Sequence, residues 1–516
     1  MDNVAVAQRF KAFLLIGAGL LLATLLGFNI GSENYAPLLL GVVIVIALSI
    51  GLFLGDSFWV LTIASSFLAG SFPILRGSFT PFQFMVTMGV ARFLVGDIVL
   101  RRKSIRWGKS TDLLVLAGFM LVLTYHGVHD RFGMKFLGSN VWGGRNYVNV
   151  FVGLAAFFIV QSIDLKSKVW AKLPFAVLCV TGFDVVIALI TTFFPSTIYK
   201  IFPFYSAVSL AGIQELLGTP DSYQFGEPTA RLGSFGTFGL VIILLVLGSV
   251  SLPNLLSLTN LPRLVAAMFG GLAVLLSAFR TSVLQTILGV VLAGIRDLKW
   301  AVLLLLPVIA AALFSLSIVN SEFVRLPKSI QRSLQFVPGK WNAEMERDAA
   351  ASNEFRQQVW RVFLREYFPH HPLLGRGFGF RSALAQTSVY QYNPYWDRDM
   401  VEVGNIHNGF FGALDAMGIV GTVFFILWNL RLLLRTFRVP RHSRDPAATA
   451  LRFLALYLGV LILFYWMGAY TIGSFLPQEF ALAGVFLRLQ QTVAGDEEET
   501  PRISKRVPTQ LAPIVS

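Results

Sequence analysis

Charge is scarce in this sequence. Of its 516 residues, 14% are charged and 55% are hydrophobic, and phenylalanine alone occurs 46 times. A soluble globular domain carries roughly a quarter charged residues, and a soluble chain of this size could not bury so much apolar surface. The composition therefore predicts an all-α polytopic membrane protein and excludes a disordered chain or a disulfide-stapled secreted scaffold.

Cysteine is nearly absent, and the common catalytic motifs are missing. The single cysteine, Cys179, can form no intrachain disulfide. The sequence has no P-loop, no dinucleotide-binding glycine pattern, no His-Glu-x-x-His and no cysteine-based metal spacing. We therefore expect no cofactor and no metal, and look for chemistry among arginine and histidine side chains.

Long apolar runs are what the sequence has in abundance. A bilayer core of about 30 Å needs about 20 apolar residues per helix. Such stretches occur near 12–30, 36–55, 58–75, 81–99, 111–125, 147–163, 173–194, 234–252, 264–279, 281–295, 300–318, 407–428, 450–472 and 477–491. We expect 12 to 14 transmembrane helices, and we divide the chain into four regions. Residues 1–318 hold about eleven spans, 319–405 form a large, partly helical outer loop, 406–491 hold the last three spans, and 492–516 form a disordered tail.

The positive charges indicate the orientation. The formal net charge is +14, and lysines and arginines cluster at 101–109, 166–172 and 431–444. By the positive-inside rule, these clusters and both termini are cytoplasmic. Keeping 431–444 inside requires residues 264–295 to form two short helices that turn at Arg280, near the outer interface. The middle of the outer loop, 353–368, has an apolar or aromatic residue every four positions, at Phe355, Val359, Phe363 and Tyr367, and is predicted to be helical.

Three arginines on the predicted outer face are candidate anion ligands. Arg280 lies between two very apolar stretches and Arg231 begins a span, so each is either an interfacial anchor or a fixed cation in a membrane-level cavity. Arg356 lies on the loop helix with Trp360 four residues later, which places both on one face. The planar guanidinium fork suits a phosphate.

His407 is the candidate general base. It opens the span after the large loop, next to Asn408, where the helix dipole disfavours the imidazolium and keeps the ring neutral. The alternative is a capping or interfacial histidine. His370 and His371 look like a polar turn between two prolines.

Other charged residues carry weaker signals. Asp397 and Asp399 have a spacing that some glycosyltransferases use for a divalent metal, but a solvated loop is the simpler interpretation. Arg92 and Asp184 fall near the middles of two spans, where a structural pair with each other is one possibility.

Four places together resemble the O-antigen ligase and polymerase superfamily of bacterial membrane glycosyltransferases. They are the small-residue-plus-arginine end of a span at 277–281, the Arg-to-Trp helix at 356–360 with the Pro–Gly loop at 372–379, the His-Asn span start at 407–408 with 414–421, and the large outer loop itself. The resemblance covers roughly residues 231–421.

The resemblance implies a glycosyltransferase class C-like fold in the bacterial inner membrane, with a periplasmic active site. The donor would be a glycan on a polyprenyl diphosphate. The acceptor hydroxyl would belong to a lipid A-core sugar in a ligase, to a lipid-linked repeat unit in a polymerase, or to a protein in some relatives. Polymerase and ligase remain open.

The candidate residues make chemical sense of this reaction. Arg280 and Arg356 would stabilise the diphosphate leaving group, and His407 would deprotonate the acceptor. Arg231, Arg376, Asn408 and Trp360 would bind substrate. No metal is required. The alternative is a transporter or flippase of lipid-linked glycans, which should line a path with ionisable residues. Membrane lipid is an expected partner, and nothing favours nucleic acid.

Overall fold

The computed structural model describes residues 53–72, 79–93, 110–129, 144–163, 165–201, 204–206, 232–378, 396–402, 404–441, 443–468 and 472–499. Regular structure within these ranges is helical, apart from two isolated β-bridges. The all-α polytopic prediction is therefore confirmed. The span expected near 12–30, and nearly all of the one near 36–55, lie outside the described residues.

The helices follow the apolar stretches closely. The first half of the chain contributes η1 (Gly55–Ser57), α3 (Phe58–Ala64), η2 (Ser65–Phe67), α4 (Pro81–Phe93), α5 (Ser110–His129), α6 (Gly144–Ser162), α7 (Ser167–Trp170), α8 (Leu173–Phe193), η5 (Pro195–Thr197), α9 (Ile198–Ile201), α11 (Gly233–Ser249), η7 (Leu252–Leu256) and η8 (Leu258–Asn260). The second half contributes α12 (Leu261–Leu276), α13 (Arg280–Leu298), η9 (Lys299–Leu304), α14 (Leu305–Ile318), η10 (Val319–Phe323), α15 (Lys328–Leu334), α16 (Ala343–Val362), η11 (Phe363–Tyr367), η12 (Phe368–His370), α17 (Trp396–Glu402), α18 (Gly409–Thr436), α19 (Ala448–Met467) and α20 (Ile472–Glu499).

Six helical stretches among the described residues are long and apolar enough to cross a membrane. They are Asp112–His129, Ser167–Phe193, Leu258–Leu276, Arg280–Phe323, Gly409–Thr436 and Ala448–Met467, and Phe58–Phe67 and Gly233–Ser249 are shorter apolar helices. The stretch Arg280–Phe323 is interrupted at Lys299, whose φ of 56° ends α13 before η9 and α14 begin. Two of the expected spans, 281–295 and 300–318, are therefore separate helices.

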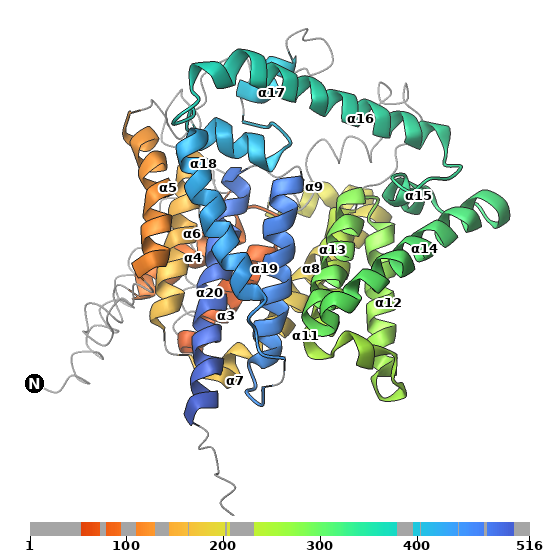
Figure 1. Ribbon diagram of the computed structural model, residues 1–516, viewed down its shortest axis with the longest axis horizontal. Helices are drawn as coiled ribbons and strands as arrows, with labels where there is room; N and C mark the ends of the chain where they lie inside the picture. Colours follow the sequence, from red (N-terminus) through yellow and green to blue (C-terminus); the bar gives the residue numbers. More distant parts are fainter. Residues whose placement is uncertain are drawn as a thin grey trace, which may run out of the picture.

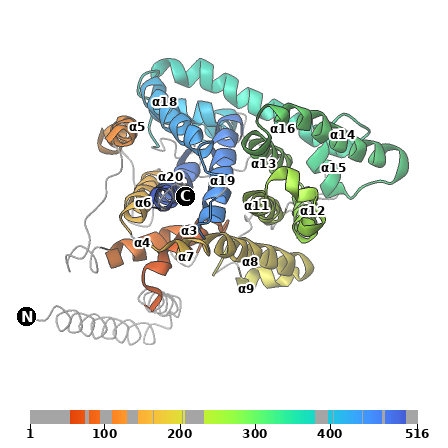
Figure 2. The same ribbon diagram turned by 60° about the horizontal axis from the view of Figure 1, so that its bottom comes forward.

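The last two helices form the centre of the bundle. In α19, 83% of the apolar membrane-spanning segment is buried inside the protein. Helix α20 packs along α6. Figure 2 shows both helices surrounded by the others. Glu479 of α20 is fully buried and accepts a hydrogen bond of 2.9 Å from Trp428 Nε1 of α18. The remaining helices pack around this centre, and α14 lies at the periphery (Figure 2).

The bundle has two distinct ends. The helices α15, α16 and α17 of the long outer segment lie across one end, which we call the loop end (Figure 1). The opposite end carries the turns between α11 and α12 and between α18 and α19. There, Arg431 and Arg435 reach Asp112 at 3.1 and 2.6 Å, and Ser167 Oγ donates to Asp445 Oδ2 at 2.8 Å. The lysine and arginine clusters at 166–172 and 431–444 therefore share the opposite end, which the sequence assigns to the cytoplasm.

The hairpin at Arg280 has the expected form. Helix α12 ends at Leu276 and α13 begins at Arg280. Ala278, between them, has a φ of 62°, and this left-handed residue reverses the chain. Ser333 of α15 donates a 2.9 Å hydrogen bond from Oγ to Leu275 O. The turn, and with it the start of α13, thus lies at the loop end.

The helix in the outer segment is longer than the sequence interpretation gave. We predicted helix over 353–368, whereas α16 begins at Ala343. Asn342 caps it, because its side chain accepts a 2.9 Å hydrogen bond from Glu344 N, and Glu344 and Glu346 favour the first turn. The four-residue spacing found the second half of the helix and missed its more polar beginning, where Met345 is the buried hydrophobic residue.

Candidate active site

A small second core at the loop end joins the elements that carry the candidate residues. It consists of the buried side chains Val359, Phe363, Met400, Val401, Ile406 and Leu414. These come from α16, η11, α17 and the first turns of α18. Phe355, Trp360 and Phe411 pack against it. This core brings the helix of Arg356 against the start of α18, where His407 lies.

His407 is held by contacts on both sides of it in the chain. Trp360 Nε1 donates a 2.8 Å hydrogen bond to Ile406 O, just before the histidine. Asn408, just after it, caps α18, because its Oδ1 accepts from Phe411 N at 3.1 Å. Tyr465 OH donates to Gly409 O at 2.9 Å. A histidine fixed in this way keeps its position when substrate binds, as a preorganised base must.

The backbone of His407 is in an uncommon conformation. Its φ is 53°, in the left-handed region where non-glycine residues are rare. The Phe355 ring meets the imidazole edge to face, with 5.7 Å between ring centroids. Strained backbone of this kind is over-represented at functional sites.

The surroundings of His407 keep its imidazole neutral. Burial lowers its pKa below the ordinary 6.5, and the nearby Arg356 guanidinium lowers it further. Because the protonated form is disfavoured, the imidazole is neutral and able to accept a proton at neutral pH. The position just before the N-terminus of α18 acts in the same direction. His407 thus has the protonation state of a general base.

Arg356 keeps its hydrogen-bonding capacity unused. Its side chain is half-buried on α16, yet it forms no hydrogen bond or ion pair within the part of the chain that the structure describes. A guanidinium next to a neutral histidine, with five free donors, is suited to an anion between them. The helix that carries Arg356 contacts the His407 segment at two places, through the Phe355 ring on the imidazole and the Trp360 Nε1 hydrogen bond to Ile406 O.

Arg280 lies at the same end of the bundle on a different wall. It is the first residue of α13, two residues after the left-handed Ala278, and its side chain is half-buried. The N-terminus of a helix attracts anions through its free N–H groups and dipole. Arg231, the weakest of the predicted arginines, lies outside the described residues.

Arg376 is placed differently from the other arginines. Its Nε donates to Asp415 Oδ1 at 2.7 Å and its Nη2 to Val401 O at 2.8 Å. Its guanidinium carbon lies 4.5 Å from the centroid of the Tyr367 ring. The side chains of Arg376 and Asp415 are 11% and 7% exposed. Burial alone would lower the pKa of Arg376, but Asp415 and Glu402 raise it on balance. A substrate-binding role for Arg376 stays a prediction, since the structure engages this side chain in a buried ion pair.

The loop that carries Arg376 is inserted into a break in α18. Gly418 has a φ of 60° and a ψ of −167°, which interrupts that helix. An uninterrupted helix would join Ile419 N to Asp415 O and Val420 N to Ala416 O. Instead, the loop supplies all four partners: Arg376 N to Asp415 O at 2.6 Å, Gly377 N to Ala416 O at 3.1 Å, Ile419 N to Pro372 O at 2.8 Å and Val420 N to Leu373 O at 3.1 Å. The backbone groups opened by the kink are thereby satisfied.

Two glycines make this insertion possible. A Cβ on Gly418 would lie 2.3 Å from Leu373 C, and a Cβ on Gly375 would lie 2.5 Å from Gly418 N. Both glycines also have positive φ, so neither position accepts a side chain. His126 Nε2 lies 2.7 Å from Leu374 O and fastens the loop to α5.

The remaining candidates have structural partners. Asp397 Oδ2 accepts a 3.0 Å hydrogen bond from Gln358 and fastens α17 to α16. Asp184 does not rely on Arg92, because its carboxylate accepts from Tyr205 OH at 2.5 Å and Ala69 N at 2.8 Å. Arg92 Nη1 donates to Gly55 O. His371 contributes its carbonyl to the inserted loop, accepting from Gly375 N at 3.1 Å.

Part of the chain is similar to a known protein family. Residues 265–426, about a third of the chain, match the family model described as O-antigen ligase. The match includes Arg280, Arg356, Arg376, His407 and Asn408. Over these residues the chain is similar to proteins of the O-antigen ligase family, and its long apolar helices fit a multi-pass membrane protein. The search of curated proteins returned no match.

Sequence reasoning missed the partners of two groups. Phe355, which contacts the His407 imidazole, appeared only as one of the aromatic positions of the loop helix. Asp415, which binds Arg376, is 39 residues away in the chain, so no periodicity connects the two. The glycines near Arg376 and near Asp415 were the one signal in the sequence for this second contact, because glycines allow two backbones to approach closely.

Proposed function

We propose that the protein transfers a glycan from a polyprenyl-diphosphate-linked donor to an acceptor hydroxyl at the loop end, which would face the periplasm. The observation that carries the proposal is the position of His407: its ring contacts Phe355 on the helix that carries Arg356, and burial together with the nearby Arg356 guanidinium lowers its pKa. The O-antigen ligase match over 265–426 supports it independently.

The proposed reaction is a direct displacement at the anomeric carbon. The acceptor oxygen forms a bond to that carbon, while the bond from the carbon to the diphosphate oxygen breaks. The acceptor proton passes to the His407 imidazole, and the anomeric centre inverts. Negative charge grows on the departing diphosphate, where Arg356 and Arg280 stabilise it. Arg231, Asn408 and Trp360 are proposed to bind substrate, and Asn408 and Trp360 also fix the backbone beside the histidine. Arg376, also predicted to bind substrate, is proposed to act mainly through its buried ion pair with Asp415.

A direct assay tests the activity and divides its two forms. Purified protein in detergent is incubated with lipid-linked repeat units alone, and with lipid A-core added in a second reaction. A ladder of longer lipid-linked glycans without lipid A-core would identify a polymerase. Glycan joined only to lipid A-core would identify a ligase. If neither product forms while labelled donor crosses the membrane of proteoliposomes, the protein is a flippase or transporter.

Metal dependence offers a second test of the proposed chemistry. If arginines neutralise the diphosphate, transfer should persist at its full rate in the presence of a strong chelator of divalent cations. A strict requirement for a divalent cation would contradict this mechanism and return attention to Asp397 and Asp399. In that case, activity of the Asp397→Asn variant would show whether this carboxylate binds the metal or only joins α17 to α16 through its hydrogen bond with Gln358.

A further inference from the structure

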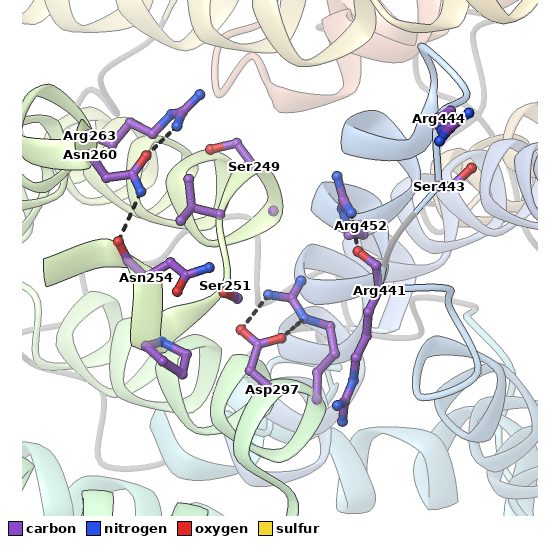
Figure 3. A pocket seen from close by; sticks show the side chains of 14 residues that line it. Ser249, Ser251, Asn254, Asn260, Arg263, Asp297, Arg441, Ser443, Arg444 and Arg452 are labelled. Carbon is purple, nitrogen blue, oxygen red and sulfur yellow. Dashed lines mark hydrogen bonds and ion pairs between the residues drawn. The ribbon is translucent and has the colours of Figure 1, made fainter. Parts of the chain in front are cut away.

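A polar cavity lies at the end of the bundle opposite His407. Its volume is about 760 Å³. The turn after α11, the start of α12, the end of α13 and the turn before α19 surround it, as Figure 3 shows for the labelled side chains. Neither the O-antigen ligase match nor the proposed reaction assigns a role to it.

The cavity carries a strong excess of positive charge. Its lining includes five arginines and a single aspartate: Arg263, Arg296, Arg441, Arg444, Arg452 and Asp297. The aspartate is already in use, because Arg296 binds it through two hydrogen bonds of 2.7 and 2.9 Å and Leu252 N donates to it at 2.8 Å. The other four lining arginines thus find no free carboxylate within the lining.

Two of the arginines direct unused donors into buried space. Arg296 Nη1 and Arg452 Nε are both buried and have no hydrogen-bond partner. The side chain of Arg296 is 9% exposed. Arg452 is held by a 2.5 Å hydrogen bond from its Nη1 to Arg441 O. Charged donors without a partner are costly to bury, and cytoplasmic arginines that only set topology keep their heads in water.

We propose that this cavity binds the phosphate group of an anionic ligand. Oxygen atoms of a phosphate accept hydrogen bonds from several guanidinium groups at once, and five arginines line this one cavity. The hydroxyls of Ser249, Ser251 and Ser443 line the same space as neutral donors. The phosphate belongs either to the headgroup of an anionic phospholipid or to a soluble phosphate compound.

The position of the cavity connects two helices of the candidate active site. Helix α13 begins with Arg280 and carries Arg296 near its end, and α18 begins just after His407 and leads to the turn with Arg441. A phosphate held between Arg296 and Arg441 would fasten the far ends of both helices. The site is nevertheless independent of the proposed transfer reaction and is tested by binding alone.

The test measures binding to the purified full chain in a zwitterionic detergent. The probes are dioctanoyl phosphatidylglycerol, dioctanoyl phosphatidylcholine as its zwitterionic counterpart, and inorganic pyrophosphate. Each is titrated while the thermal unfolding midpoint is recorded, since a ligand of the native state raises it with concentration. We expect phosphatidylglycerol, pyrophosphate or both to bind, and the responding probe identifies the source of the phosphate.

Three variants separate this site from general charge attraction. Arg452→Gln and the exposed Arg444→Gln should each weaken binding about tenfold, the effect of losing one charge-assisted hydrogen bond. Arg438→Gln is the control, because Arg438 is exposed on the same turn but does not line the cavity. Absence of binding by both anionic probes would overturn the proposal. So would equal binding by Arg444→Gln and wild type, or equal weakening by Arg438→Gln.

Discussion

Two arginines of the loop end, twenty positions apart, occupy opposite kinds of surroundings. Arg376 is buried, with its guanidinium shared among Asp415, Val401 O and the face of Tyr367. Arg356 is half-buried beside His407 and uses none of its donors within the described chain. Both belong to motifs that resemble the same family. From this difference we infer that Arg376 stabilises the frame of the candidate site, whereas Arg356 is placed to bind a ligand.

The two regions also differ in their backbone. Around Arg376, four hydrogen bonds between the loop and α18 replace the two helical bonds that the kink removes. At His407, a left-handed residue follows a carbonyl fixed by Trp360 and precedes the helix cap Asn408. The first region is a closed structural joint. The second places the His407 imidazole near the Arg356 guanidinium, which forms no hydrogen bond within the described residues.

Removing the base should have the largest effect on activity. We expect His407→Ala to lower the rate of glycan transfer by about 10²–10⁴-fold, the usual contribution of a positioned general base. The measurement is transfer from lipid-linked donor by purified protein. His370→Ala is the control, since His370 is an exposed histidine of the same segment. A His407→Ala enzyme with wild-type activity would sink the proposed mechanism.

Breaking the joint should have the largest effect on stability. Asp415→Ala removes the nearest carboxylate of Arg376 and leaves a buried charge poorly compensated, at a cost of about 3–5 kcal/mol. The free energy of unfolding in denaturant is the measurement. Glu366→Ala serves as the comparison, because its ion pair with Arg398 is exposed and its loss should leave stability near wild type. Equal destabilisation by both changes would show that burial of the Arg376–Asp415 pair does not matter.

The second cation tests whether the open site extends to α13. Arg280→Ala should lower transfer by about 10²–10³-fold, as removal of a group that stabilises developing negative charge does. Expression and melting temperature verify that the α12–α13 turn survives. The control is Arg361→Gln, an exposed arginine on α16. If Arg280→Ala retains full activity, the turn at Ala278 has a structural role alone.

The smallest expected effect concerns protonation. Arg356 is one of two causes that lower the His407 pKa, and burial is the larger. In Arg356→Gln the pKa should therefore rise toward 6.5 without reaching it. The imidazole would then become protonated at a higher pH than in wild type. The rate at which diethyl pyrocarbonate modifies His407, followed against pH by peptide mass spectrometry, reports this without any need for activity. An unchanged or lowered pKa would show that the two groups do not interact.

The sequence was sufficient for the all-α polytopic fold, and its candidate site residues stay predictions. Hydropathy predicted the helices, and the charge clusters predicted that α12 and α13 turn back at Arg280. His407 was recognisable because a histidine at the start of a span is unusual. The Arg376 joint was not predictable, because its partners come from distant segments and its kink depends on two glycines that meet only in three dimensions. The same reason hid the arginine cavity, whose walls come from three segments far apart in the chain, 248–263, 296–297 and 441–452.

One paired measurement tests the contrast between the two arginines most directly. Arg356→Gln and Arg376→Gln are compared for both transfer rate and free energy of unfolding. The account predicts that Arg356→Gln loses about 10²–10³-fold in rate at wild-type stability, whereas Arg376→Gln loses about 3–5 kcal/mol of stability. A destabilised Arg356→Gln with normal transfer by its folded fraction, together with a stable but inactive Arg376→Gln, would contradict it.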